Sequence, residues 1–377
     1  MSTIIDTHQS HADEHAVVGP SADEFAERVL QSALGWAETM AFYLGDRLGW
    51  YRSLAQHGPS TAAELAERTQ TSPRYAREWL EQQAVTGILI ADDAQDATTR
   101  RFTLPSGAVE ALTDERSLAY IAPLPRMVGA VGPQTAALLE AYRSGGGVSW
   151  EQLGVDAREA QADLNRPWFA QLPAVFAEVD RIHEVLSRPG ARIADVGMGA
   201  GWSSISLALG YPELHVDGFD VDAPSVELAR ANAAAAGVAD RVRFHLAGGD
   251  SLEDVGPFDG AFAFECVHDM SRPVDVLHAM RRAVREDGIV VIMDEAVGET
   301  FGGPGAEFEP LMYAFSLFVC LPDGMSDHPS AATGTVMRPG ILRDYAQAAG
   351  FDDISVLPID DFSFFRFYEL LFDADGA

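Results

Sequence analysis

Residues 193–202 read Ile-Ala-Asp-Val-Gly-Met-Gly-Ala-Gly-Trp, and this stretch decides the fold of the chain. The apolar run from Ile193 to Val196 predicts a buried parallel strand, and residues 203–209 predict the helix that follows it. Three glycines lie between them at alternate positions, where glycine lets the backbone turn sharply and approach a ligand closely. The free N–H groups at a helix start can bind such a ligand. The stretch therefore predicts a cofactor-binding loop at the mouth of a strand–loop–helix unit.

The spacing of the glycines separates two kinds of cofactor loop. The dinucleotide fingerprint is G-x-G-x-x-G, in which Gly197 and Gly199 fit but the third position is Trp202. The pattern D-x-G-x-G-x-G resembles instead motif I of class I S-adenosylmethionine (SAM) dependent methyltransferases. In that family the acid of the motif, here Asp195, contacts the methionyl end of SAM. A nicotinamide dinucleotide remains the alternative ligand for this loop.

Two acids downstream of the loop fit the same family. Asp220 follows a predicted strand at residues 214–219, about 20 residues beyond the glycines, where an acid can bind both ribose hydroxyls. Asp250 follows a predicted strand at residues 242–246, and the resemblance implies that it binds the adenine amino group. The complete set that we expect to bind SAM, with S-adenosyl-L-homocysteine as product, is Asp195, Gly197, Met198, Gly199, Gly201, Asp220, Val221, Gly249, Asp250, Ser251 and Glu265.

The rest of the C-terminal sequence continues the alternation of strands and helices. The predicted elements are helices at 225–236, 274–284 and 339–349 and strands at 258–264 and 289–293. Two final strands, 354–357 and 363–369, resemble strands 6 and 7 of the methyltransferase sheet, the last one antiparallel. We therefore expect an α/β fold with a doubly wound, Rossmann-like sheet of seven strands, preceded by a mostly helical winged-helix domain.

The N-terminal region predicts that second domain. Ser21 and Glu24 fit a capping box, and apolar residues recur at helical spacing over residues 25–54 on more than one face, which indicates burial against a partner subunit. Two further helices and a hairpin around residues 91–100 complete a winged-helix plan. This plan resembles the dimerisation domain of small-molecule O-methyltransferases, and residues 77–88 resemble an uncharacterised bacterial subgroup of that architecture. The resemblance implies a homodimer formed through the N-terminal helices.

The charge of the chain limits its partners. The chain has 57 acidic residues and 26 basic residues, and every basic residue is an arginine, so the net charge is −31. Such a surface repels phosphate backbones and anionic membranes, so we expect neither nucleic acid nor membrane as a partner. A SAM-sensing regulator that binds DNA through the winged helix remains a competing function. Two cysteines without evident pairing, and no signal segment or long apolar run, predict a cytoplasmic protein.

The ends of the fourth and fifth predicted strands should carry the chemistry, because ligands of open α/β sheets bind at the carboxyl ends of strands. A hydroxyl acceptor needs a base, and histidine is the usual choice near neutral pH. Residues 267–271, Val-His-Asp-Met-Ser, resemble the segment of plant-type O-methyltransferases that carries the catalytic histidine. The resemblance implies His268 as the base and Glu295 as the acid that orients it, whereas Asp269 is predicted to be a turn or cap residue. The second carboxylate of that family has no counterpart around residues 335–338.

Four parts of the chain are expected. Residues 1–20 form a disordered tail, and residues 21–119 form a winged-helix dimerisation domain. Residues 120–190 form a helical linker that lines the active site, and residues 191–377 form a SAM-binding domain with a lid insertion at 298–339. Apolar and aromatic residues in the insertion indicate a small, largely apolar substrate. No His, Cys or Asp group has metal-ligand spacing, so no metal site is expected. Methylation of nitrogen or sulfur, and a SAM-dependent reaction without methyl transfer, stay open on the same fold.

Overall fold

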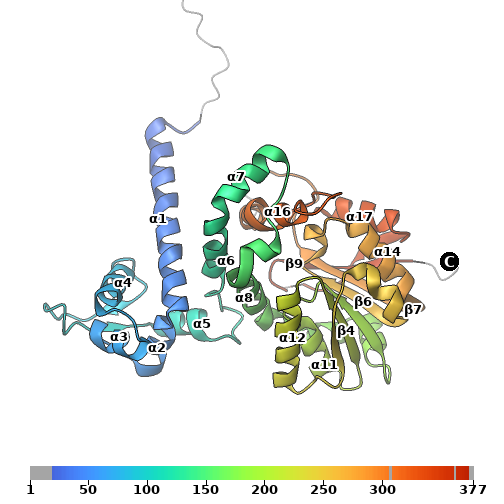
Figure 1. Ribbon diagram of the computed structural model, residues 1–377, viewed down its shortest axis with the longest axis horizontal. Helices are drawn as coiled ribbons and strands as arrows, with labels where there is room; N and C mark the ends of the chain where they lie inside the picture. Colours follow the sequence, from blue (N-terminus) through green and yellow to red (C-terminus); the bar gives the residue numbers. More distant parts are fainter. Residues whose placement is uncertain (1–18, 305–307, 361, 373–377) are drawn as a thin grey trace, which may run out of the picture.

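The computed structural model of the chain describes residues 19–304, 308–360 and 362–372, and it leaves the side chain of Asp250 undescribed. The tail predicted over residues 1–20 therefore lies outside the described residues except for its last two. Figure 1 shows a helical N-terminal part and a C-terminal part built on a sheet, with a group of helices between them. Among the described residues, no helix is both long and apolar enough to cross a bilayer.

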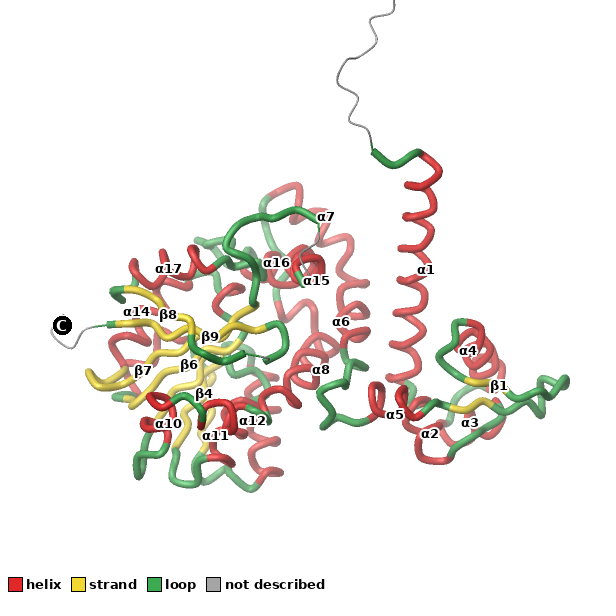
Figure 2. Tube along the Cα trace, turned by 180° about the vertical axis from the view of Figure 1, so that it is seen from behind, coloured by secondary structure: helices red, strands yellow, loops and turns green. Residues whose placement is uncertain are grey.

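A seven-stranded sheet forms the centre of the C-terminal part, with helices on both sides (Figure 2). Its order is β5-β4-β3-β6-β7-β9-β8, and only β9 runs antiparallel to its neighbours. The strands are β3 (Arg192–Val196), β4 (His215–Asp220), β5 (Val242–Leu246), β6 (Phe258–Phe264), β7 (Val284–Glu295), β8 (Asp353–Val356) and β9 (Phe365–Leu371). The predicted doubly wound sheet is confirmed. Its inner strands read as continuous apolar runs because helices bury both of their faces.

Two hydrophobic cores hold the helices to the sheet. One core packs Phe176 between Phe262 and Phe367, with ring centroids 5.8 and 5.7 Å away. The other core packs Leu277 and Leu342 on the opposite face. The helices of the first face are α9 (Leu172–Ala177), α10 (Asp180–Leu186), α11 (Trp202–Gly210) and α12 (Ala223–Ala236); those of the second are α13 (Leu252–Val255), α14 (Pro273–Ala283) and α17 (Pro339–Ala348).

The N-terminal part has the predicted winged-helix plan and a core of its own around Trp50, Leu80 and Phe102. Its elements are α1 (Ala22–Arg47), α2 (Trp50–His57), α3 (Ala62–Thr69), α4 (Pro73–Val85), β1 (Ile90–Ala91), β2 (Phe102–Thr103) and α5 (Ser106–Thr113). The helical pattern predicted over residues 25–54 is not one helix, because Gly49 adopts a left-handed φ of 70° and separates α1 from α2.

The first turns of α1 pack against no other element in the described part of the chain. Every residue from 22 to 37 is exposed, and the exposed fractions of Phe25, Val29, Leu34 and Trp36 are 50, 68, 54 and 62%. Figure 1 shows this end of α1 extending away from the rest of the molecule. A helix with large apolar side chains on a free surface is typical of an interaction site.

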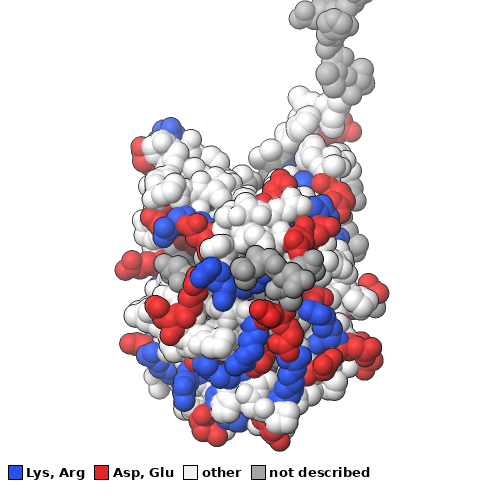
Figure 3. All heavy atoms as spheres, turned by 90° about the vertical axis from the view of Figure 1, so that its right-hand side faces the viewer, with Lys and Arg blue, Asp and Glu red and all other residues white. Residues whose placement is uncertain are grey.

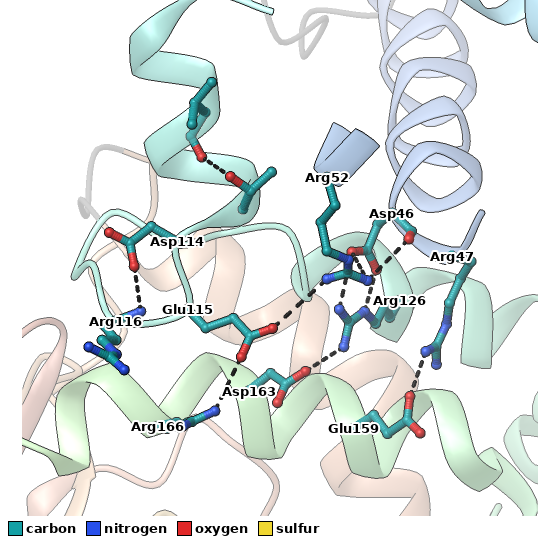
Figure 4. Close-up of polar contacts among 12 residues, drawn as sticks. Asp46, Arg47, Arg52, Asp114, Glu115, Arg116, Arg126, Glu159, Asp163 and Arg166 are labelled. Carbon is teal, nitrogen blue, oxygen red and sulfur yellow. Dashed lines mark hydrogen bonds and ion pairs between the residues drawn. The ribbon is translucent and has the colours of Figure 1, made fainter. Parts of the chain in front are cut away.

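Ion pairs join the N-terminal part to the helices that follow it (Figure 4). These helices are α6 (Leu124–Val131), η1 (Gly132–Gln134), α7 (Thr135–Ser144) and α8 (Trp150–Phe169). Arg126 of α6 is buried and donates to Asp46 of α1 and to Asp163 of α8, each at 2.5 Å. Arg47 of α1 pairs with Glu159 of α8 at 2.5 Å. Because a buried charge must keep its partners, this network fixes α8 relative to α1.

The predicted insertion after β7 contains three short helical segments. They are α15 (Glu309–Phe315), the π-helical η4 (Ser316–Cys320) and α16 (Leu321–Gly324), and residues 305–307 of the insertion lie outside the described part. The insertion packs on the helices before the sheet: Tyr142 of α7 donates to the carbonyl oxygen of Leu317 at 2.9 Å, and the backbone N–H of Trp150 donates to Asp323 at 2.7 Å. Helix α7 and the start of α8 therefore contact the insertion, although these segments lie far apart in the sequence.

Candidate active site

A cavity of about 810 Å³ opens at the carboxyl ends of β3, β4, β6 and β7. Its walls include the glycine loop after β3, the segments after β4 and β5, the turn after β6, the end of β7, helix α8 and the insertion. A volume of this size lies within the range of small-molecule sites. The cavity at this end of the sheet, where the sequence predicts the active site, is thus large enough for a cofactor and a second small molecule.

The three glycines of the loop differ in what surrounds them. A Cβ added to Gly199 would meet no atom within 4 Å, and Gly199 lines the cavity at a left-handed φ of 51°. A Cβ on Gly201 would lie 2.7 Å from the ring of Phe244, and one on Gly197 would lie 2.7 Å from the sulfur of Cys266. Gly199 therefore leaves space for a ligand, whereas Gly201 permits close packing and does not line the cavity.

Asp220 at the end of β4 lines the cavity with its carboxylate held in place. One oxygen accepts the backbone N–H of Gly199 and the other that of Asp222, both at 2.8 Å. Burial raises its pKa, while these hydrogen bonds oppose the rise. Each carboxylate oxygen retains a further lone pair, so the group can accept hydrogen bonds from a diol. Met198, Val221 and Gly249, which were also expected to bind the cofactor, line the cavity as well.

Asp195 does not line the cavity, although it was expected to contact the methionyl end of SAM. Its side chain is fully buried, and one oxygen accepts the hydroxyl groups of Ser203 at 2.6 Å and Ser204 at 2.5 Å. Burial raises its pKa to about 6. The carboxylate therefore holds the first turn of α11 against β3. Ser251 also lies outside the lining, and the side chain of Asp250 lies outside the described part.

His268 lies in the 3₁₀ turn η3 (Val267–Asp269) and lines the cavity with only 2% of its surface exposed. Its Nδ1 lies 2.9 Å from Oδ1 of Asp294, in a hydrogen bond, and 3.2 Å from Oε2 of Glu295, which makes no hydrogen bond. The orienting bond expected from Glu295 is therefore made by Asp294, the neighbouring residue of β7. Burial lowers the pKa of His268, but the charges of Asp294 and Glu295 outweigh it and raise that pKa well above its usual range.

Two more acids, Glu265 and Asp269, lie near this histidine together with Asp294 and Glu295. Burial and neighbouring charges raise the pKa of Glu265, Asp269 and Glu295 to about 8 in each case. Glu265 has a left-handed φ of 56° and accepts a 2.5 Å hydrogen bond from Asn165 of α8. Asp269, predicted to be a turn or cap residue, ends the 3₁₀ turn η3 and lines the cavity.

The structure also brings together residues that could bind a metal, which the sequence spacing did not predict. One set joins His268 with Asp294 and Glu295, and the other joins it with Asp269 and Cys320, with ligand atoms in each set within 4.8 Å of one another. The sets come from η3, the end of β7 and the insertion, so no local spacing could indicate them. The absence of a metal stays a prediction.

Helix α8 supplies two site residues that sequence reasoning did not name, Arg158 and Asn165, and one that it left between active-site wall and packing, Phe169. Arg158 donates to both oxygens of Asp222, at 2.6 and 2.8 Å, and Asn165 bonds Glu265. Phe169 lines the cavity, whereas its neighbour Trp168 packs on Phe362 with ring centroids 5.6 Å apart. The spacing of 158, 165 and 169 places these residues on one helical face, which is the signal that could have found them.

Two family models match the chain. Residues 193–288 match a methyltransferase domain, and residues 37–114 match an Rv2258c-like winged HTH domain. A stretch of 71 residues is 45% identical to release factor glutamine methyltransferase of Chlorobaculum tepidum; it is 18% of this chain and 24% of that protein. The chain thus spans about a quarter of the length of the curated relative that it matches.

Solved structures resemble the chain over nearly its whole length. An O-methyltransferase family protein from Burkholderia thailandensis has a TM-score of 0.67 at 18% identity, over 95% of this chain and all of the other. Human N-acetylserotonin methyltransferase, solved in complex with SAM, has a TM-score of 0.63 at 17% identity, over 94% of this chain and all of the other. At these identities the likeness establishes the fold, including the order of the two domains.

Proposed function

In its domains and fold the chain is a class I SAM-dependent methyltransferase with an N-terminal winged helix, and we propose that it transfers the methyl group to an oxygen atom of a small, largely apolar molecule. One observation carries the proposal: the open space at Gly199 and the ring of His268 line the same cavity. Bound SAM supplies an electrophilic methyl group on a sulfonium centre. The chain has to position the acceptor oxygen and remove its proton.

The glycine loop and the end of β4 are the parts that fit the cofactor. We expect residues 197–199 to lie along it, Asp220 to bind the ribose, and Val221 and Gly249 to contact the adenine. The support is that Asp220 is fixed by two backbone N–H groups and that Gly199 has room for a ligand. Glu265 lines the cavity between this loop and His268.

His268 is the proposed general base, with Asp294 rather than Glu295 as the acid that orients it. The bond from Nδ1 to Asp294 leaves Nε2 as the nitrogen for the acceptor proton. In the ligand-free site the two neighbouring acids favour the imidazolium form, which cannot accept a proton. A positive charge bound beside the ring would favour loss of that proton, so the base becomes competent only in the loaded site.

The insertion is the proposed lid over the acceptor. Phe315, Val319 and Cys320 line the cavity from this segment, opposite the glycine loop. Two apolar side chains in that wall support an acceptor with an apolar body. The hydrogen bonds of the insertion to Tyr142 and Trp150 tie its position to the helices before the sheet.

The free face of α1 is the proposed homodimer contact. A second copy that places its own α1 there would cover Phe25, Val29, Leu34 and Trp36, which are all at least half exposed in one chain. Isologous contacts of this kind are the commonest in soluble oligomers. A cytoplasmic location fits the two unpaired cysteines.

Binding calorimetry with SAM, S-adenosylhomocysteine and NAD tests the central proposal. We expect SAM and S-adenosylhomocysteine to bind one site per chain and to raise the melting temperature through ligand linkage, while NAD does neither. An unchanged melting temperature at saturating SAM would refute it. Mass analysis of turnover then separates oxygen from nitrogen or sulfur methylation and from a reaction without methyl transfer.

A DNA-binding regulator is the competing function, and charge disfavours it. Arg74 of the second helix of the motif pairs with Glu78, and Arg100 of the wing pairs with Glu81. Figure 3 shows the opposite side of the molecule, the face of the C-terminal part, where acidic and basic side chains are interleaved as well. We expect no mobility shift with duplex DNA even at low salt, where electrostatic binding is strongest.

A further inference from the structure

The acceptor end of the cavity contains more negative than positive groups. Three carboxyl groups line it around His268; we call them the inner acids, Glu265, Asp269 and Glu295. Asp294 adds a fourth carboxyl group directly behind the ring. The only cation among these residues is His268 itself, so this end holds an excess of three acidic groups when all are ionised.

The two basic side chains that line the rest of the cavity are already used. Arg158 is bonded to Asp222 through both oxygens, and Arg272 lies 3.9 Å from Asp275. Neither contacts an inner acid. The sulfonium of a bound cofactor offsets one charge of the excess, which leaves about two acidic groups uncompensated within the described part of the site.

One inner acid, Glu295, has a buried oxygen without a hydrogen bond, and a second, Asp269, lines the cavity without one. Glu295 is 3% exposed, and its Oε2 makes no hydrogen bond although it lies 3.2 Å from the ring of His268. Asp269 is half-buried, and its carboxylate is given no hydrogen bond by the described residues. A buried carboxylate without a partner is costly, and it becomes favourable when a ligand supplies the cation.

We propose that the methyl acceptor carries a protonated amine as well as an apolar body, and that Asp269 and Glu295 bind this ammonium group. The inference rests on the proposed function, because it takes the space beside His268 to be the acceptor site. Phe315 and Val319 of the opposite wall would contact the apolar body. The same charges disfavour an acceptor that bears a carboxylate or phosphate, since like charges at close range repel.

Three phenols of similar shape and different charge test the proposal. Calorimetry on the full chain saturated with S-adenosylhomocysteine compares tyramine, a cation, with 4-ethylphenol, which is neutral, and with 4-hydroxyphenylacetate, an anion. We expect tyramine to bind about tenfold more tightly than 4-ethylphenol and the anion to bind most weakly. Equal affinities, tighter binding of either of the other phenols, or no measurable binding of tyramine would overturn the proposal.

Variants identify the acids responsible. Asp269→Asn should reduce the preference for tyramine over 4-ethylphenol to less than about threefold, and Glu295→Gln should reduce it as well. Asp327→Asn is the matched control, because Asp327 lines the cavity but is exposed to solvent, so the preference should stay. An unchanged preference in both inner-acid variants would refute their role.

Binding of S-adenosylhomocysteine, measured first in every protein, separates the two levels of the argument. A chain that fails to bind S-adenosylhomocysteine contradicts the proposed function. A chain that binds it and then shows no charge preference among the phenols contradicts only the inference about the acceptor. A variant that has lost its fold is recognised by the loss of S-adenosylhomocysteine binding, and the comparison of the three phenols on the unaltered chain still decides.

Discussion

Replacing Gly199 by alanine should weaken SAM binding while the protein stays folded. The added Cβ would meet no protein atom within 4 Å, because it projects into the cavity. The fold therefore loses only what a left-handed backbone costs a residue with a side chain, about 1–2 kcal/mol. A ligand pressed against the loop would have to move away from the new methyl group.

The size of the binding defect follows from the cost of overpacking. Inserting a methyl group into a closely packed contact costs about 1–3 kcal/mol, which corresponds to a 5- to 150-fold weaker affinity. A stability loss near 1 kcal/mol should lower the melting temperature by about 2–4 °C in a domain of this size. Calorimetric titration with SAM and thermal unfolding without ligand measure the two effects separately.

Two other glycines supply matched controls. Gly237 ends α12 at a φ of 74°, has open space at its Cβ and does not line the cavity, so Gly237→Ala carries the backbone strain alone. Gly201→Ala adds a clash 2.7 Å from Phe244 to a φ of 77°, which should destabilise the fold by about 2–5 kcal/mol. Only Gly199→Ala should change the affinity of the folded protein for SAM. Wild-type affinity in Gly199→Ala, or an equal loss of affinity in Gly237→Ala, would refute the reasoning.

Three further predictions concern His268, Asp195 and α1. Asp294→Asn should lower the pKa of His268, followed by NMR, more than Glu295→Gln does, because Asp294 accepts the Nδ1 bond and exerts the larger charge effect; the reverse order would contradict this assignment. The folded chain keeps the Asp195 proton up to a pH of about 6, whereas the unfolded chain releases it near 4, so stability from this group is lost as the pH rises through 6. Between pH 5 and 7, the free energy of unfolding measured with urea should fall by about 1.4 kcal/mol more in the wild type than in Asp195→Asn. Parallel pH profiles of the two proteins would contradict the raised pKa of Asp195. Val29→Asp and Leu30→Asp should shift the particle mass in light scattering from twice 40.6 kDa to 40.6 kDa, whereas Gln31→Asp on the polar side of α1 should not; a monomeric wild type would end the dimer proposal.

Local sequence pattern was enough to predict most of the fold. The strands β3 to β6 are short stretches rich in apolar residues and bounded by turn residues, and the helices between them have clear starts and ends, so their order along the chain follows from short-range physics. The start of β7 at Val284, five residues before the predicted strand, was missed. The glycine loop and Asp220 could be assigned in the same way, because both lie at fixed positions relative to the ends of strands. The break between α1 and α2 at Gly49 was missed, because the apolar spacing continues across it.

The chemistry at the far end of the cavity depended on the tertiary structure. Asp294 and Glu295 are adjacent in sequence, and only the packing of β7 against η3 decides which of them bonds His268. Likewise the roles of Gly199 and Gly201 differ through what lies next to each Cβ.

What the sequence by itself determined, then, is the order of strands and helices along the chain and the position of the glycine loop between β3 and α11, because these depend on neighbours within a few residues. What only the tertiary structure decided is the electrostatic environment of the site. Glu265 and Asp269 follow β6 and Glu295 ends β7, and their charge matters because folding removes them together from water. Desolvation and charge–charge distance are properties of the folded chain, so no local pattern of residues contains them.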